Sequence, residues 1–308
     1  MTGRGAAGRG TAESIAVAVP TRDRPEPLAR CVDTLLAGDV GPGEVLVVDQ
    51  SRDDATLRAI EARRCAGAPI RYLRIPPRGL SAARNAAAAA TERPILAFTD
   101  DDCVPARGWV ATLDRVFAES TELAAVTGPV LPLGPARPGL HAVSGRTSAV
   151  RAEYRVRALP WRVGTGGNTA VRRAWLERLG GFDERLGAGT PGGAGEDMDL
   201  LYRLLRAGGT IRYEPDARVF HERQSTARRL ASRPRYGHGM GAFCALRLRR
   251  RDPYALAILA RWCLDRGRIL AGACLLARWR RAREEALMLR GAGAGLIYGL
   301  RLREQGDA

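Results

Sequence analysis

Residues 14–24 read SIAVAVPTRDR, a short valine-rich apolar run that ends at Pro20 and is followed at once by charged residues. An uninterrupted apolar run of this length, bounded by proline, is typical of a buried strand. Apolar residues then recur at Leu28, Val32 and Leu35, which is the spacing of one face of a helix. The stretch therefore predicts a strand, a polar loop and a helix.

The same unit recurs along the first third of the chain. Apolar runs predict strands at residues 44–49 (EVLVVD), 70–75 and 95–99, and helical patterns lie between them at residues 53–64 and 81–91. Strands that alternate with helices imply a mostly parallel, doubly wound α/β sheet. Ligands of such sheets lie beside the carboxyl ends of the strands, so the polar residues after each strand become the first candidates for a site.

The second half has longer connections, beginning with a Pro- and Gly-rich stretch at residues 129–139. Further helices are expected at residues 109–119, 172–179 and 196–207, and further strands at residues 123–130, 211–214 and 218–221. Beyond roughly Leu246 the pattern is helical and rich in arginine. We expect three parts: a flexible N-terminal tail over residues 1–13, a globular domain over residues 14–222 and a helical, basic extension over residues 223–308.

Charge is distributed unevenly along the chain. The net charge is +16, and every basic side chain is an arginine, which also fits the composition of a GC-rich genome. From His221 onward there are 19 arginines against 7 acidic residues. The extension is therefore the part expected to meet anions, whereas the absence of a zinc, stacking or basic-region motif argues against nucleic acid as the partner.

Cysteine usage and hydropathy bear on the compartment. The six cysteines form no CxxC pair, several lie in apolar stretches, and we interpret them as small core residues in a reducing compartment. The N-terminal residues show no secretory signal, and no apolar window reaches the roughly 18 residues that a spanning helix needs. The sequence therefore predicts a cytoplasmic protein.

Three consecutive aspartates, Asp100 to Asp102, follow the predicted strand at residues 95–99. Like charges this close raise one another's pKa unless a cation neutralises them, and hard carboxylate oxygens suit Mg²⁺ or Mn²⁺. His221, at the end of another predicted strand, is a plausible third ligand. A solvated acidic loop and a structural histidine are the alternatives.

Glu196 and Asp197 open a predicted helix after a glycine-rich run. A carboxylate at this position can act as a helix cap, which contributes about 0.3–1 kcal/mol. It can also serve as a general base, which a reaction at an acceptor hydroxyl requires.

Eight short segments together resemble family 2 inverting glycosyltransferases. Each is a weak motif alone, but their order and spacing over residues 14–222 are specific. They are VPTRDR (19–24), VVDQS (47–51), GLSAARN (79–85), FTDDD (98–102), GGN (166–168), GGFDE (180–184), GEDMDL (195–200) and VFH (219–221).

The resemblance implies a GT-A type of fold and a set of site residues. The segment FTDDD corresponds to the DXD motif of such enzymes, so Asp100, Asp102 and His221 would hold Mn²⁺ or Mg²⁺. Asp197 would be the catalytic base, with Glu196 beside it. Donor-binding residues would be Pro20, Thr21, Asp23, Asp49, Arg84, Asp100, Asp101, Gly167 and Asn168.

The implied activity is a metal-dependent, inverting transfer of a sugar from a nucleotide diphosphate donor to an acceptor hydroxyl. A non-catalytic protein of the same fold that binds a nucleotide sugar or an anionic partner is the alternative. A sugar-1-phosphate nucleotidyltransferase is disfavoured, because such an enzyme would carry a glycine-rich loop directly after the first strand. In this chain the residues at that position, Thr21 to Pro25, contain no glycine.

Short apolar runs interleaved with arginine at residues 254–265 and 268–283 suit helices that lie on an anionic membrane surface. Helices packed on the core, with arginine as their solvated face, are the alternative. The membrane interpretation predicts a peripheral position on the inner face of the cell membrane and an acceptor that is lipid-linked or part of a cell-envelope glycan.

Overall fold

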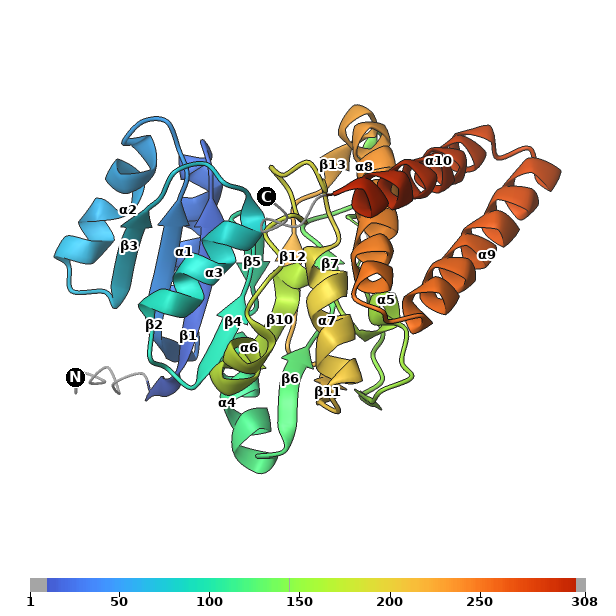
Figure 1. The fold of residues 1–308 in the computed structure, drawn as a ribbon. Helices are drawn as coiled ribbons and strands as arrows, with labels where there is room; N and C mark the ends of the chain where they lie inside the picture. The colour runs from blue at the N-terminus through green and yellow to red at the C-terminus, as the bar shows by residue number, and fades with distance from the viewer. Residues whose placement is uncertain (1–9, 144, 303–308) are drawn as a thin grey trace.

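A mixed sheet forms the centre of the computed structural model, which describes residues 10–143 and 145–302 (Figure 1). Within these residues its eight strands follow the order β3-β2-β1-β4-β10-β6-β11-β9. In that order they are β3 (Ile70–Arg74), β2 (Val40–Asp49), β1 (Gly10–Thr21), β4 (Ile95–Phe98), β10 (Thr169–Arg172), β6 (Leu123–Thr127), β11 (Thr210–Tyr213) and β9 (Ala152–Tyr154).

Strand directions confirm the predicted mostly parallel α/β sheet. The first four strands of the order run parallel, and β11 runs parallel to β6. Strand β10 is antiparallel to both of its neighbours, and β9 is antiparallel to β11. The carboxyl ends of β1, β2 and β4 therefore meet at one edge.

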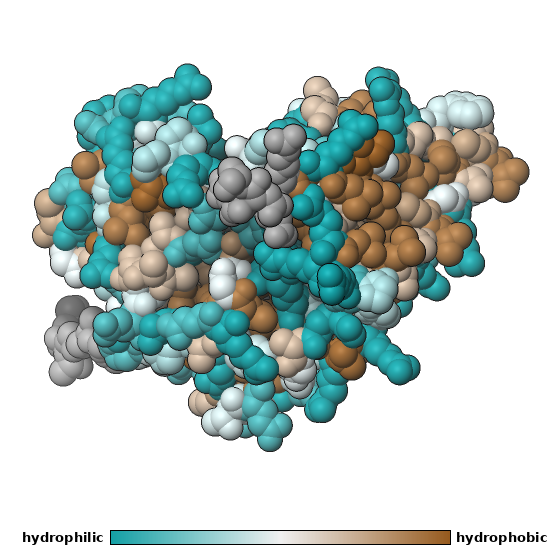
Figure 2. Space-filling model, in the orientation of Figure 1, coloured by the Kyte–Doolittle hydropathy of each residue, from teal (hydrophilic) through white to brown (hydrophobic). Residues whose placement is uncertain are grey.

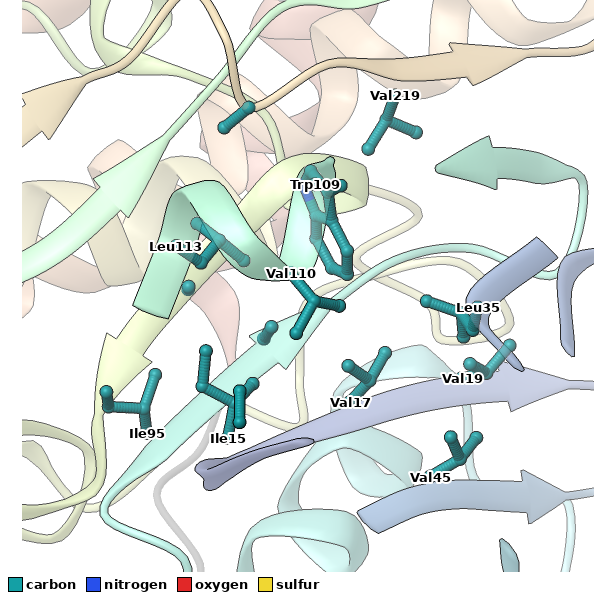
Figure 3. Close-up of a cluster of buried hydrophobic side chains, with 14 of the residues drawn as sticks. Ile15, Val17, Val19, Leu35, Val45, Ile95, Trp109, Val110, Leu113 and Val219 are labelled. Carbon is teal, nitrogen blue, oxygen red and sulfur yellow. The ribbon is translucent and has the colours of Figure 1, made fainter. Parts of the chain in front are cut away.

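Two hydrophobic cores lie on the two faces of the sheet, and β1 contributes to both. Because successive side chains of a strand point to opposite faces, Ile15, Val17 and Val19 enter one core while Ala16 and Ala18 enter the other. Figure 3 shows the first of these cores, where valines of β1 and β2 meet a tryptophan and leucines of the covering helices. The covering helices are α1 (Pro25–Leu36), α2 (Ala55–Cys65) and α4 (Trp109–Glu119) on the first face, and α3 (Leu80–Ala90), α6 (Arg173–Leu179) and α7 (Glu196–Arg206) on the second.

The first strand is longer than its apolar run. It begins at Gly10, so residues 10–13 extend the sheet beside β2 and do not belong to a tail as predicted. Residues 1–9 of the predicted tail lie outside the described residues.

The predicted strand at residues 123–130 is present as β6 but ends earlier, because the chain leaves the sheet after Thr127. A side chain at Gly128 would overlap the backbone of Ala217, and Pro129 lacks the N–H that would continue the ladder. A separate strand, β7, starts at Val130 and joins a second, smaller sheet.

Small sheets extend the main sheet at the edge where the candidate residues gather. Strand β12 pairs with β5 and β7, and this pairing sets His221 opposite Cys103. The remaining short elements are β5 (Cys103–Pro105), β7 (Val130–Pro132), β8 (Leu140–His141), β12 (Val219–His221), β13 (Gln224–Ser225), α5 (Pro160–Val163) and a 3₁₀ turn (Gly166–Asn168).

Three long helices fill the predicted helical region in the described part of the chain: α8 (Thr226–Arg249), α9 (Tyr254–Leu275) and α10 (Trp279–Arg301). They pack on the globular part through α7, where the Tyr202 and Phe243 rings meet edge to face at 5.3 Å. Figure 1 shows α8 beside the sheet, with α9 and α10 reaching outward from it. No helix among the described residues combines the length and hydropathy needed to cross a membrane.

Helices α8 and α10 meet backbone to backbone along four glycines: Gly237 and Gly241 of α8, and Gly291 and Gly295 of α10. We call these residues the glycine seam. A Cβ at any of them would overlap a carbonyl oxygen of the other helix. The residue numbers of the contacting pairs rise together along the two helices, from Gly237 beside Met288 to Gly241 beside Ala292. The two helices therefore run parallel.

Two glycine-to-alanine substitutions in α10 should change stability in opposite directions. Gly293→Ala adds a methyl group at an exposed position with nothing within 4 Å, so it should stabilise the protein by about 0.5–1 kcal/mol. Gly295→Ala forces the same methyl group against the His238 carbonyl, and overpacking of this kind typically costs about 1–3 kcal/mol. Urea unfolding followed by circular dichroism measures both. If both substitutions changed the free energy of unfolding in the same direction, the close contact between the helices at the glycine seam would be contradicted.

Candidate functional site

A cavity of about 970 Å³ opens at the carboxyl edge of the sheet and continues between the sheet and α8–α10. It brings together most of the residues that the sequence singled out. The predicted residues that line it are Pro20, Arg84, Asp100, Asp101, Asp102, Gly167, Glu196, Asp197 and His221.

Three predicted donor-binding residues, at and just after the ends of β1 and β2, do not line the cavity. The Thr21 hydroxyl donates to Asp101 at 2.8 Å. Asp49 is fully buried, and its carboxylate accepts from the Ser51 amide and the Tyr72 hydroxyl at 2.8 and 2.6 Å. Asp23 accepts from the amide of Arg52 at 3.0 Å and thereby ties the first loop to the second.

Asn168 also lies outside the cavity, and its side chain is engaged with three other segments. Its Oδ1 accepts from the Trp109 indole at 2.9 Å, and its Nδ2 donates to the carbonyls of Pro129 and Ala217 at 2.9 and 2.7 Å. These bonds join α4 to the loops around β7 and β12. The side chain does not line the cavity, and the predicted part of Asn168 in donor binding stays a prediction.

The three aspartates are held by two arginines from different elements. Arg24 donates to Asp101 at 2.6 Å and to Asp102 at 2.9 Å, while Arg84 donates to Asp100 at 3.1 Å. Burial, opposed by Arg24 and reinforced by Asp102, raises the pKa of Asp101 to about 7. The cluster is thus short of positive charge despite its arginine partners.

His221 faces Asp102 in a way that suits a cation. Its Nδ1 lies 2.8 Å from the backbone carbonyl of Glu222, which can only accept, so Nδ1 carries a proton. In the neutral ring Nε2 then turns its lone pair toward Asp102 Oδ1, 3.2 Å away. A proton or a metal ion can bridge two acceptors that face each other, and a histidine oriented by its other nitrogen is the usual form of a metal ligand.

Cys103 is the member of this group that the sequence did not reveal as a site residue. Potential ligand atoms of Asp100, Asp102, Cys103 and His221 all lie within 4.8 Å of one another. Burial, followed by the Asp100 carboxylate, raises the pKa of the Cys103 thiol and keeps it protonated. The oxygen and imidazole donors that remain suit Mn²⁺ or Mg²⁺ better than a thiolate-seeking ion.

Arg84 links the aspartate cluster to the start of α7. It is 1% exposed, and its second guanidinium nitrogen donates to Glu196 at 3.1 Å. Burial and, after it, the neighbouring Asp197 raise the pKa of Glu196 above its usual range, although Arg84 opposes the shift. Glu196 is therefore a buried partner of Arg84 at the cavity wall.

Asp197 has both carboxylate oxygens fixed by backbone amides. Oδ2 accepts from Gly166 at 2.9 Å, and Oδ1 accepts from Met198 in its own helix at 2.8 Å. The chain turns through Gly166 and Gly167, and a Cβ at Gly167 would lie 2.7 Å from Asp100 Oδ2. The two glycines thus allow the backbone to pass between Asp197 on one side and the aspartate cluster on the other.

Several lining residues were missed as site residues by the sequence analysis. Arg24 lies in the loop after β1, and its charge was the only feature of the sequence that could have indicated a place in the site. Arg228, from the first turn of α8, reaches to 3.7 Å from Asp102 Oδ2. A further group comes from the helical extension, which the sequence linked to no chemistry at the sheet edge; its members are Arg233, Tyr236, Met240, Trp262, Arg266 and Met288.

Comparison with protein families gives one matching model, described as "Glycosyltransferase like family 2", over residues 12–235. A pre-mycofactocin glycosyltransferase of Mycobacterium tuberculosis is 30% identical over 245 residues, which are 76% of this chain and 48% of the relative. The succinoglycan biosynthesis protein ExoM of Rhizobium meliloti is 32% identical over 219 residues, covering 68% and 66%. The chain thus spans about half the length of the mycobacterial relative.

Among solved structures, a mannosyltransferase of Pyrobaculum calidifontis in complex with GDP-mannose and Mn²⁺ superposes with a TM-score of 0.62. It is 20% identical, and the match covers 92% of this chain and 87% of the other. At this identity the likeness concerns the fold, and it confirms the GT-A type of sheet that the eight segments implied.

Proposed function

The chain belongs to the glycosyltransferase-like family 2, and on this premise we propose that it moves a sugar from a nucleotide diphosphate sugar to an acceptor hydroxyl, with inversion at the anomeric carbon. One observation carries the proposal. Asp197 and the aspartate cluster line the same cavity, on either side of the turn at Gly166 and Gly167.

At the donor end, Asp100, Asp102 and His221 would hold Mn²⁺ or Mg²⁺. Such an ion, when bound, neutralises charge on a departing diphosphate. Arg228 adds a guanidinium beside Asp102 with more than half of its side chain exposed, so it is free to pair with phosphate oxygens. Thr21, Asp23 and Asp49, at and just after the ends of β1 and β2, would bind the nucleoside of the donor, and Asp101 would contribute from the cavity wall itself.

At the acceptor end, Asp197 would accept the proton of the attacking hydroxyl. Its two backbone hydrogen bonds hold the carboxylate in place while leaving lone pairs for the acceptor. Attack from the side of Asp197 on a sugar whose diphosphate lies at the aspartate cluster displaces the leaving group from the opposite face. Inversion follows from this placement.

A panel of nucleotide diphosphate sugars tested by thermal shift, with and without Mn²⁺, examines the proposal on the whole chain. At about 100 times its Kd a ligand stabilises a protein by about 2.7 kcal/mol, which corresponds to several degrees for a chain of this size. One donor should raise Tm only when the metal is present. A folded protein that responds to no donor contradicts the proposed function.

The turn between α9 and α10 supports the predicted contact with an anionic membrane. Leu275, Leu276 and Trp279 are 87%, 63% and 68% exposed there, near the exposed Arg268 and Arg278. Figure 2 shows apolar residues gathered over α9 and α10 on the face in view. Apolar side chains that enter a bilayer, flanked by arginines that pair with lipid phosphates, are the features of an interfacial helix.

Replacing Leu275, Leu276 and Trp279 together with serine should abolish co-sedimentation with phosphatidylglycerol vesicles. Each arginine near an anionic surface contributes about 1 kcal/mol, so the unchanged protein should also bind far more weakly to phosphatidylcholine alone. Leu256→Ser, at an exposed position near the opposite end of α9, serves as the control. Equal binding by the triple variant and the control would remove the membrane contact.

A further inference from the structure

The cavity has a second wall, formed by α8, α9 and α10. Its apolar part consists of Met240, Trp262 and Met288, all of which line the cavity while remaining less than 8% exposed. Neither the aspartate cluster nor Asp197 belongs to this wall, so the proposed transfer step leaves it unused.

Arg233 of α8 is buried in this wall with unused hydrogen-bond donors. It is 4% exposed, and its Nε and Nη2 have no hydrogen-bond partner in the described part of the chain. Nη1 reaches the sulfur of Met288 at 3.9 Å, and Nε lies 3.7 Å from a Glu284 oxygen. That carboxylate already accepts two hydrogen bonds from Arg229 at 2.9 Å.

Positive charge is in excess around Arg233. The ion-pair cluster between α8, α9 and α10 contains two carboxylates, Glu284 and Glu285, which are shared among four arginines. The four are Arg229, Arg233, Arg266 and Arg281. Burying guanidinium groups without matching anions is unfavourable, and burial accordingly lowers the pKa of Arg233, with Arg229 adding to the shift.

Tyr236 connects this wall to the proposed base. Its ring lies 5.7 Å from the Arg233 guanidinium carbon. Tyr236, Arg233 and Asp197 line the same cavity. A molecule with its hydroxyl at Asp197 can therefore extend past Tyr236 to Arg233.

We propose that Arg233 binds an anionic group of the acceptor, a phosphate or a carboxylate, while an apolar part of the acceptor packs on Met240, Trp262 and Met288. The assignment rests on the proposed function, because it takes the molecule in this wall to be the acceptor. Planar guanidinium groups bind such oxyanions through two parallel hydrogen bonds, which the free Nε and Nη2 can supply.

Octyl phosphate is a suitable probe, since it joins one anionic group to one apolar chain. Calorimetric titration of the full chain without added metal should show binding. Arg233→Met should weaken it about ten- to a hundredfold, the usual effect of losing a hydrogen bond to a charged group. Arg235→Met removes the same charge from an exposed position of the same helix and should leave the affinity unchanged.

Two further ligands and two further variants make the result decisive. Inorganic phosphate and 1-octanol should each bind more weakly than octyl phosphate; equal binding by phosphate would remove the apolar wall from the proposal. Arg233→Gln serves if the methionine variant fails to fold. Unchanged affinity in the Arg233 variants, or a loss caused by Arg228→Met instead, would overturn the assignment in favour of the diphosphate end.

The nucleotide-sugar panel separates this inference from the proposed function. Octyl phosphate binding that depends on Arg233, in a chain that responds to no nucleotide sugar, would contradict the transferase and retain the anion site. A metal-dependent donor shift without octyl phosphate binding would retain the transferase and overturn the anion site.

Discussion

Replacing Asp197 with asparagine is expected to lower the turnover of sugar transfer by about 10²–10⁴-fold, the usual contribution of a positioned general base. Asparagine keeps the size of the side chain and one acceptor oxygen, so the hydrogen bond from Gly166 can persist. What it loses is the capacity to take the acceptor proton. Initial rates at saturating donor and acceptor measure the effect.

Donor affinity and folding decide whether that loss has a chemical origin. Asp197→Asn should bind the nucleotide diphosphate as the parent does and unfold at nearly the same urea concentration. If donor affinity falls together with turnover, or if the midpoint of unfolding falls, the carboxylate acts as a cap for α7 and the assignment of the base is wrong.

Replacing Asp102 with asparagine is expected to remove the metal-dependent part of the thermal shift caused by the nucleotide sugar. Asp102 faces His221 at 3.2 Å, and both would be ligands of the same ion. Even the outer hydrogen-bond partners of metal ligands contribute roughly 10–100-fold to affinity, so loss of a ligand should weaken Mn²⁺ binding by roughly 100-fold or more. The variant in Mn²⁺ should then behave like the parent in EDTA.

Folding should survive this substitution, because Arg24 retains Asp101 as a partner at 2.6 Å. Asp39→Asn, at an exposed surface carboxylate paired with Arg107, is the matched control and should leave the shift intact. A metal-dependent shift that persists in Asp102→Asn would reject the residue as a ligand.

The strands and the polar residues after them could be predicted because their signals are local. A valine-rich run such as residues 14–20 defines a buried strand by itself, and parallel strands must bring Pro20 and Asp100 to one edge. His221 was predicted as the end of a further strand, but that strand belongs to the smaller sheet, and its pairing with β5 sets His221 opposite Cys103. The structure brings these residues to one cavity, whereas their individual roles stay predictions.

Other parts of the site depend on packing between distant segments, which a sequence pattern does not encode. Asn168 forms hydrogen bonds with Trp109 and with two backbone carbonyls, and the sequence indicated none of these contacts. Arg233 was one of many arginines in a basic helix, and only the fold shows that it is buried beside the cavity. The glycines of the seam recur four residues apart in the sequence, but the sequence does not show which helix packs against them.

The glycine seam also affects how a mutational scan of this protein would be interpreted. Every replacement of Gly241 or Gly295 adds at least one carbon where the opposite backbone already lies, so no substitution there is conservative. Helix α8 carries Arg233 and Tyr236, so parting the helices would disturb the cavity from a distance. A scan scored by activity alone would rank these glycines with Asp197. Only a parallel measurement of protein abundance would separate substitutions that impair folding from those that impair the reaction.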